Sequence, residues 1–269
     1  MGRGVNGFGK KGEPPPEAVE ALRSGTGRGV RIAVLDSGIE TGHPALGGLI
    51  LRDDIAIASD GLRLHAEPGN GRDVFGHGTA VAGLIRALAP EAEIGSIRVL
   101  GEGLDSRTAV IREGARQAIE RGYQVLNCSF GCGVLDHVLH YKSWIDEAYL
   151  RRVHVVAACN NSDYTRPEWP AHFPTVISVN MTDAPGSDTL FYRPDSLVEF
   201  LAHGVNVRVP WREGGTREIT GSSFAAARVA GMVARILSGV PELSPIEMKT
   251  LLHRLARPWH DGKSGMGES

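Results

Sequence analysis

The chain alternates short apolar runs with longer amphipathic segments. The first run, VRIAVLD (30–36), holds consecutive apolar residues from Ile32 to Leu35 and ends on an aspartate. Such a run is typical of a strand that is buried on both faces of a parallel sheet. Further runs of this kind are EIGSIRVL (93–100), VLNCSF (125–130), VHVVAAC (153–159) and TVISVN (175–180). We therefore expect a strand in each of these segments.

The segments between the runs have helical periodicity. In SRTAVIREGARQAIERG (106–122), Ile111, Ala115, Ala118 and Ile119 share one face, and Gly122 supplies a stop signal. We expect further helices at HGTAVAGLIRALA (77–89), at 136–152, at 223–239 and at SPIEMKTLLHRLAR (244–257). In the last of these, Ser244 and Glu247 have the spacing of a capping box.

Strands that alternate with helices predict an open α/β fold. The fold class is α/β, with three layers (α/β/α) and a mostly parallel central sheet. We expect one domain over residues 15–257, with flexible tails at 1–14 and 258–269, which are rich in Gly, Lys, Pro and Ser. In such sheets, ligands bind at the carboxyl ends of the strands.

Composition narrows the function classes. The chain has 269 residues, 42% of them hydrophobic, and a net charge of -2, so it can bury one large core and has no basic excess for nucleic acid or an anionic membrane. No apolar run approaches the length of a bilayer span. The opening MGRGVNGFGKKGEPPP has no apolar centre, so it does not resemble a signal peptide. We expect a cytoplasmic protein, although a secreted protein trimmed of its signal would look the same.

The polar residues at the ends of these elements suggest a catalytic site. Asp36 ends the first strand, His77 opens a helix, and Ser223 opens a later helix in ITGSSFAAARVAG. In an Asp–His–Ser set, the hydroxyl attacks a carbonyl, the imidazole moves the proton, and the carboxylate orients the imidazole. Each residue alone has an ordinary structural explanation, because Asp is common in turns and Ser is a favoured helix cap.

The strings around these three residues carry a family resemblance. DSG, HGTAVAG and GSSFAAARVAG resemble, in the same order, the Asp, His and Ser motifs of the subtilisin-like serine proteases (subtilases, peptidase S8 family). VVAACNNS resembles that family's oxyanion-hole segment, NCSFG its substrate-binding strand, and WPAHFPTVISV a framework segment. The resemblance covers roughly residues 15–255, which makes the domain a catalytic one.

The resemblance implies a role for each motif residue. Ser223 would be the nucleophile, His77 the general base and acid, and Asp36 the residue that orients His77. The side chain of Asn160 and the backbone N–H of Ser223 would form the oxyanion hole. Ser222 stands where the family more often has Thr, and it would support the nucleophile.

The resemblance also implies a substrate site. A peptide or protein substrate would bind as an extended strand between two segments, with pockets for alternate side chains. Cys159 would line the primary pocket at a position where the family has Gly, and its side chain would narrow that pocket. Glu168 would lie at the base of the pocket and would favour Arg or Lys before the cleaved bond. Glu168 could equally be a solvated loop residue. The substrate-binding residues expected on this basis are Leu104, Asp105, Ser106, Ser129, Phe130, Gly131, Ala158, Cys159 and Glu168.

The sequence gives little support for metals. The chemistry requires no cofactor, and structural calcium has only weak candidates in Asp53, Asp54 and Asp60. Three cysteines, Cys128, Cys132 and Cys159, lie on predicted core segments, which argues against a disulfide framework. A zinc site made from them is disfavoured, because the closely spaced cysteine pairs and a fourth ligand are absent.

Three functions remain open at this stage. The leading one is an intracellular endopeptidase with a limited maturation or regulatory role. The second is a transpeptidase or macrocyclase that resolves the same acyl-enzyme with an amine. The third is an inactive peptide-binding protein, to which the unusual Ala227–Arg228 pair and Cys159 lend slight support. The oligomeric state has no sequence signal.

Overall fold

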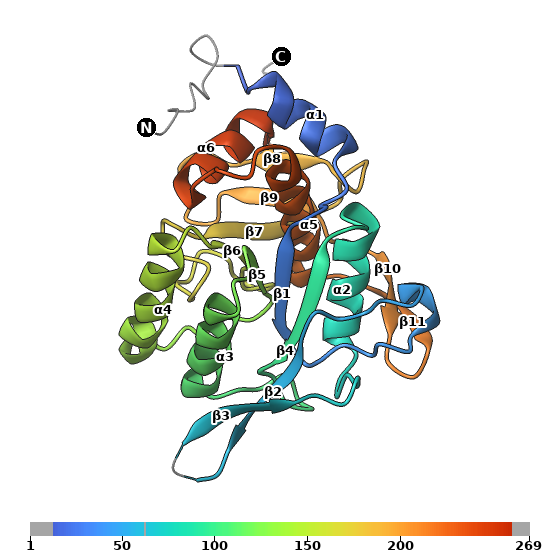
Figure 1. Cartoon of the computed structure of the whole chain (residues 1–269). Coiled ribbons are helices and arrows are strands. Elements are labelled where there is room, and N and C mark those ends of the chain that lie inside the picture. Colours follow the sequence, from blue (N-terminus) through green and yellow to red (C-terminus); the bar gives the residue numbers. More distant parts are fainter. Residues whose placement is uncertain (1–12, 62, 260–269) are drawn as a thin grey trace, which may run out of the picture.

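The structure is a computed structural model that describes residues 13–61 and 63–259. Its central sheet has ten strands among the described residues, in the order β12-β8-β9-β7-β6-β5-β1-β4-β2-β3 (Figure 1). All neighbouring pairs are parallel except β2–β3 and β8–β9. The strands are β1 (Arg31–Asp36), β2 (Asp54–Ser59), β3 (Leu64–Pro68), β4 (Glu93–Arg98), β5 (Val125–Cys128), β6 (His154–Ala158), β7 (Ile177–Thr182), β8 (Leu190–Tyr192), β9 (Phe200–His203) and β12 (Arg257–Pro258). The predicted mostly parallel sheet is confirmed.

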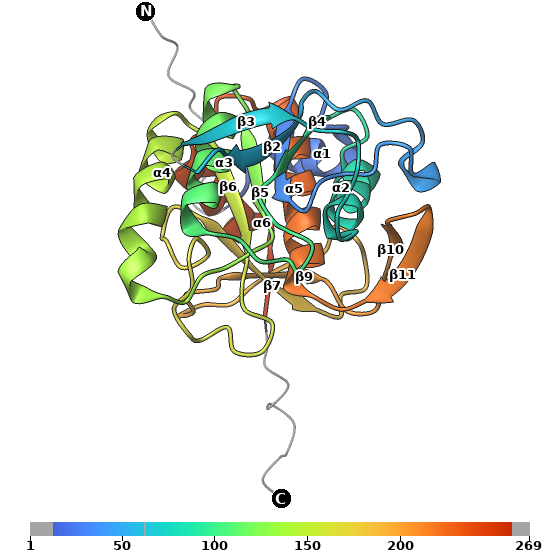
Figure 2. The same ribbon diagram turned by 90° about the horizontal axis from the view of Figure 1, so that it is seen from below.

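Helices cover both faces of this sheet, as Figure 2 shows from below. One face carries α1 (Pro16–Ser24), α2 (His77–Leu88), α5 (Ser222–Gly239) and α6 (Pro245–Leu255), and the other carries α3 (Thr108–Glu120) and α4 (Val138–Leu150). Strand β1 serves both layers, because Ile32 and Val34 pack into the first core and Ala33 and Leu35 into the second. This two-sided burial explains why its sequence is continuously apolar.

The helix that begins at Ser222 runs through the larger core. Most side chains of α5 are buried, and many of the buried ones are small, including Ala225, Ala226 and Ala230. Small side chains let α5 pack closely against α1, α2 and the strands behind it. The predicted capping box is also confirmed: Ser244 and Glu247 form it at the start of α6.

Several elements were not predicted from the sequence. Helix α1 buries only Ala18 and Ala21, and most positions of β3 are exposed, so neither produces a strong apolar pattern. A separate antiparallel pair, β10 (Val207–Trp211) and β11 (Gly215–Ile219), packs beside α2 (Figure 1). Short 3-10 turns, η1 (Pro44–Leu46) and η2 (Leu135–His137), complete the described elements.

The C-terminal boundary differs from the predicted one. Residues 258 and 259 were expected in a tail, but Pro258 belongs to β12 and the N–H of Trp259 donates to the carbonyl of Tyr192 at 2.9 Å. The Trp259 ring also meets the ring of Phe191, with 5.4 Å between centroids. The sheet edge therefore extends past residue 257. Most of the predicted tails, residues 1–12 and 260–269, lies outside the described residues.

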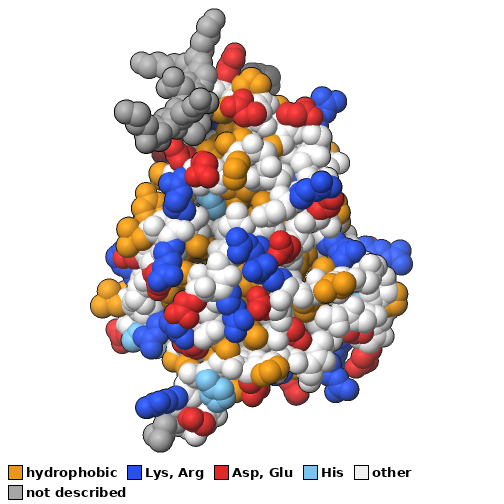
Figure 3. Space-filling model, in the orientation of Figure 1, with side chains coloured by type: hydrophobic (Ala, Val, Ile, Leu, Met, Phe, Trp, Pro, Cys, Tyr) orange, Lys and Arg blue, Asp and Glu red, His pale blue; other side chains and the backbone are white. Residues whose placement is uncertain are grey.

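The surface has mixed charge. Figure 3 shows acidic and basic side chains interspersed over the face that it presents, without a large area of one sign. Within the described ranges, no helix combines the length and hydropathy that crossing a bilayer requires.

Candidate active site

The topology brings three predicted site residues to one edge of the sheet. Asp36 is the last residue of β1, which lies between β4 and β5. His77 is the first residue of α2, and Ser223 is the second residue of α5. The carboxyl ends of the parallel strands and the starts of the helices on one face lie on the same side of the sheet. Side chains from distant parts of the chain therefore converge there.

Asp36 and His77 form a buried pair. The Nδ1 atom of His77 lies 2.9 Å from both carboxylate oxygens of Asp36. The backbone N–H of Ser37 donates to Asp36 Oδ1 at 2.8 Å and fixes the carboxylate. The close approach depends on Gly78, because a Cβ there would lie 2.1 Å from the carbonyl oxygen of Gly38. Only glycine lets α2 begin this near the end of β1.

The surroundings of His77 raise its pKa above the ordinary value of 6.5. Burial acts in the opposite direction, since it disfavours the imidazolium. The charge and hydrogen bond of Asp36, with a smaller contribution from the charge of Asp73, outweigh that burial. The pair therefore stabilises the imidazolium that forms when His77 accepts a proton.

Asp73 is a buried residue that the sequence analysis missed. Its Oδ1 accepts hydrogen bonds from Ser37 Oγ and from the backbone N–H groups of Phe75 and Gly76, at 2.7, 3.0 and 2.7 Å. Its Oδ2 accepts from both the N–H and the hydroxyl of Thr79, each at 2.7 Å. The carboxylate thus fixes the turn that presents His77 and ties it to the residue after Asp36. The only signal in the sequence is an Asp four residues before the His.

Ser223 sits where a helix leaves a backbone donor free. The N–H of Ser222 donates to Asn161 Oδ1 at 2.8 Å, and that of Phe224 donates to the carbonyl of Gly221 at 3.2 Å. Between them, the N–H of Ser223 has no hydrogen-bond partner among the described residues. The Ser223 side chain is half-buried, and its hydroxyl likewise bonds to no residue in the described part of the chain, His77 included.

The Ser223 segment nevertheless lies beside His77. The ring of the next residue, Phe224, is 5.5 Å from the His77 ring between centroids. In unliganded sites, the hydrogen bond between nucleophile and base is often long and forms fully only with substrate.

Asn160 lies on the loop after β6 and is held in one orientation. Its Oδ1 accepts from the N–H groups of Ser162 and Asp163, at 2.8 and 2.9 Å. The amide oxygen is thereby used within its own loop, which leaves the amino group as the end that can donate to a ligand. Ser222 Oγ donates to the carbonyl of Cys159 at 2.6 Å, which fastens this loop to the start of α5. This bond gives Ser222 a supporting role next to Ser223.

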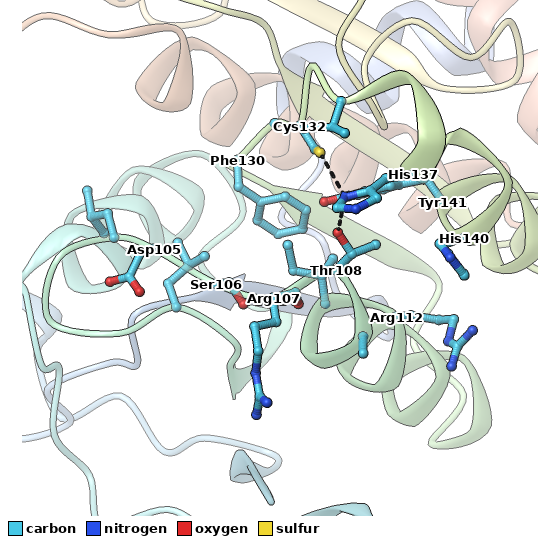
Figure 4. A pocket seen from close by; sticks show the side chains of 16 residues that line it. Asp105, Ser106, Arg107, Thr108, Arg112, Phe130, Cys132, His137, His140 and Tyr141 are labelled. Atoms are coloured by element: carbon cyan, nitrogen blue, oxygen red, sulfur yellow. Dashed lines mark hydrogen bonds between the residues drawn. The ribbon is translucent and has the colours of Figure 1, made fainter.

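Five of the predicted substrate-binding residues line one cavity of about 720 Å³. These are Leu104, Asp105, Ser106, Phe130 and Gly131, and Figure 4 shows Asp105, Ser106 and Phe130 among the lining side chains. The wall of the cavity also carries Thr108, Cys132, His137 and Tyr141; Thr108 Oγ1 lies 2.9 Å and Cys132 Sγ 3.6 Å from His137 Nδ1. The volume of the cavity falls in the range of small-ligand pockets, so it has room for at least one large side chain.

Comparison with known proteins decides the family. The sequence model described as the subtilase family matches residues 27–267, which is most of the chain. The chain belongs to the subtilase family. Its members include serine endopeptidases of the subtilisin type. The resemblance read from the three motif strings is confirmed.

Individual relatives extend this result. The subtilase is 31% identical over 240 residues to Subtilisin Savinase of Lederbergia lenta, covering 86% of this chain and 84% of the relative. It is also 31% identical over 240 residues to M-protease of Shouchella clausii, but there the 86% of this chain that aligns spans only 60% of the relative. The crystal structure of a cold adapted subtilisin-like serine proteinase superposes with a TM-score of 0.69 at 27% identity, over 86% of this chain and 83% of that one.

The other four predicted pocket residues of the subtilase, Ser129, Ala158, Cys159 and Glu168, are not among the residues that line the 720 Å³ cavity. A Cβ atom on Gly131 would fall 2.1 Å from the Glu168 Cδ, so the glutamate side chain lies directly against the Gly131 backbone. Burial raises the pKa of Glu168, and the nearby polar groups of Asn160 offset part of this effect. Ala158 is buried at the end of β6. Ser129 accepts a hydrogen bond from Asn127 Nδ2 at 3.0 Å, so its hydroxyl is partly engaged by the protein itself.

The three cysteines are all free thiols, as expected. Burial, with the nearby Glu168 charge, raises the pKa of Cys159 to about 12, and burial also raises that of Cys128. Both thiols therefore stay protonated near neutral pH. Among the described residues, no group of three His, Cys, Asp or Glu side chains is placed to hold a metal ion.

The aspartates considered for calcium have protein partners. Asp53 accepts from Arg121 Nη1 at 2.8 Å and from the Tyr123 hydroxyl at 2.6 Å. Asp54 accepts from the N–H of Gly71 at 2.7 Å. Asp60 accepts from the N–H of Arg63 at 2.8 Å, within its own turn. These carboxylates stabilise the β2–β3 region and do not converge on one point.

Proposed function

We propose that this subtilase is a serine endopeptidase that works through Asp36, His77 and Ser223. The observation that carries the proposal is the buried Asp36–His77 pair beside a helix start that presents Ser223. Ser223 Oγ attacks the peptide carbonyl carbon while His77 takes the hydroxyl proton. The carbon–nitrogen bond then breaks, and His77 gives its proton to the departing amine. Water, activated by His77, hydrolyses the acyl-enzyme and regenerates Ser223.

The oxyanion of the intermediate needs two donors that are in place before the reaction. The free N–H of Ser223 supplies one, and the amino group of Asn160 supplies the other. Two features support this assignment: the neighbouring N–H groups of α5 are already occupied, and the Asn160 Oδ1 is held by its own turn. Donors fixed in advance cost no reorganisation when charge develops.

The substrate would bind as an extended strand between Leu104–Ser106 and Ser129–Gly131. Its backbone would pair with both segments, and one side chain would enter the 720 Å³ cavity between them. The side chain before the cleaved bond would approach Glu168, whose carboxylate favours Lys or Arg. A limited maturation or regulatory role and a cytoplasmic setting belong to the same proposal.

Labelling with a fluorophosphonate probe, followed by intact mass measurement, tests the nucleophile. The wild-type protein should gain one adduct and Ser223→Ala none. An unlabelled but folded wild type would refute the active-enzyme proposal and favour the inactive peptide-binding alternative. Cleavage of matched peptides with Lys or Arg against Phe or Leu before the bond then tests specificity, and a clear Phe or Leu preference rejects the basic one. Product masses separate hydrolysis, which adds water, from transpeptidation, which does not.

A further inference from the structure

A second cluster of reactive side chains lies in the wall of the 720 Å³ cavity (Figure 4). The Cys132 sulfur is 3.6 Å from His137 Nδ1, and the Thr108 hydroxyl oxygen is 2.9 Å from the same nitrogen. None of these three residues belongs to the proposed catalytic set. They place a nucleophilic atom next to a base, beside a space that has room for a ligand.

Cys132 differs from the other two cysteines in its accessibility. Cys128 and Cys159 are buried, and burial raises the pKa of both thiols. Cys132 is only partly buried and lines the cavity, so a ligand that enters the cavity can reach it. Its backbone exchanges two hydrogen bonds with that of Trp169, at 2.9 and 3.0 Å, which fixes this residue at the cavity wall. Of the three thiols, that of Cys132 is therefore the one placed to react.

His137 gives the Cys132 thiol a place to send its proton. A thiol reacts as its thiolate, and a neighbouring imidazole can accept the proton and then stay beside the negative charge as a cation. The contact between the Cys132 sulfur and His137 Nδ1 provides the route for that transfer. The Thr108 hydroxyl bonds to the same nitrogen and so holds the imidazole ring in place.

The charges around the cavity favour an anionic ligand. Arg107 and Arg112 line it, against the single carboxylate of Asp105. Both arginines come from the N-terminal part of α3, which also supplies Thr108 (Figure 4). Guanidinium groups bind carboxylates well, so a small thiol compound that carries carboxylates would be attracted to this wall.

We propose that Cys132 is a modification site for low-molecular-weight disulfides that carry carboxylates, and that the adduct closes the cavity to substrate. The effect on substrate rests on the proposed function, in which a substrate side chain enters this cavity. The Cys132 thiolate attacks one sulfur of the disulfide, so a new S–S bond forms while that of the reagent breaks. The departing thiolate takes up the proton held by His137. Cys132 is thereby oxidised, half of the reagent is reduced to a thiol, and exchange with a free thiol reverses the step.

Glutathione disulfide tests the site, with intact and peptide masses as the readout. The wild type should gain one glutathione on Cys132, and Cys132→Ser should gain none there. In the adduct, kcat/KM for an extended peptide should fall by about tenfold or more, since a side-chain pocket is lost. Fluorophosphonate labelling of Ser223 should keep its rate, because the small probe does not need the cavity. Dithiothreitol should restore cleavage, and treated Cys132→Ser should cleave as fast as untreated Cys132→Ser.

The pH dependence of adduct formation tests His137. His137→Asn should slow the reaction about tenfold near pH 7 but less than about twofold near pH 9.5, where a thiol with the ordinary pKa of about 8.5 ionises unaided. His140→Asn is the matched control, because His140 lines the same cavity but is not the histidine bonded to the sulfur. Equal slowing at both pH values would show a merely structural role and refute His137 as the base.

The charge preference has its own comparison. Combining Arg107→Gln with Arg112→Gln should slow glutathione disulfide about fivefold and leave the neutral 2-hydroxyethyl disulfide unchanged. An unchanged rate with glutathione disulfide would overturn the assignment of an anionic ligand. Melting temperatures of all variants identify any general loss of folding.

The outcomes separate this inference from the proposed function. Absence of an adduct on Cys132, or faster modification of Cys128 or Cys159, overturns the modification site. An adduct on Cys132 that leaves peptide cleavage unchanged overturns its effect on substrate, while the proposed function stands. An untreated wild type that cleaves no peptide defeats the proposed function, whereas the masses still decide the modification site.

Discussion

Replacing Asp73 by alanine tests how the site is held together. The substitution removes a buried carboxylate that accepts five hydrogen bonds, from Ser37, Phe75, Gly76 and twice from Thr79. Three of those donors are backbone N–H groups in the turn before α2 or in its first residues. In Asp73→Ala these donors lose their acceptor within the protein interior.

The expected cost follows from the number and kind of these bonds. Hydrogen bonds to a charged group contribute about 1.5–3 kcal/mol each, but they are not additive, and removing the carboxylate also removes its own desolvation penalty. Loss of one partner in a buried charged network typically costs about 3–5 kcal/mol. We expect Asp73→Ala to lower the free energy of unfolding by that amount. Ser37→Ala, which removes one of the five donors, should cost about 1–2 kcal/mol.

Urea unfolding followed by tryptophan fluorescence measures this cost. Both variants are made in a Ser223→Ala background, so that self-digestion does not distort the curves. In the active background, the rate of fluorophosphonate labelling reports whether His77 is still presented correctly, and it should fall in Asp73→Ala. A change below about 1 kcal/mol, with unchanged labelling, would refute the idea that Asp73 fixes the turn before α2.

Three further predictions concern the site. Because the pKa of His77 is raised, the neutral base is available only at higher pH, so the acidic limb of kcat/KM should have its midpoint above 6.5; a midpoint below that value contradicts the prediction. If Asn160 is the proposed oxyanion donor, Asn160→Ala should lower kcat by about 10²–10³, which is typical of the loss of one such donor, and steady-state kinetics with an unchanged melting temperature would check it. In the folded protein, a disulfide reagent should modify Cys132 well before Cys128 or Cys159, which are buried with raised pKa values; mapping by peptide mass would expose the opposite order.

Local sequence patterns were enough to predict the main helices and the central strands. Runs such as 30–36 and 153–159 are buried on both faces, and the face of α3 with Ile111 and Ala115 has clear helical spacing. The hairpin of β2 and β3 was missed because its second strand is largely exposed and pairs only at the sheet edge. Helix α1 was missed because it is short and buries only alanines.

The candidate site, like the fold, could be predicted from the sequence only in part. Asp36, His77 and Ser223 stand inside short strings that can be recognised without any contact information. Asp73 cannot be found so, because its role depends on which donors the fold brings around it. A carboxylate in a loop looks the same in sequence whether it faces water or a buried donor.

The candidate site is completed late in synthesis, because its residues are spread along most of the chain. Its groups come from β1, α2, the loop after β6 and the start of α5, and α5 also fills the middle of the larger core. During synthesis, Ser223 is the last of them to appear. Until α5 has formed and packed against α1, α2 and the sheet, Ser223 is not held beside His77, and its N–H is not fixed at a helix start. Under the proposed mechanism, a growing chain therefore lacks a complete catalytic set until the domain has closed around α5.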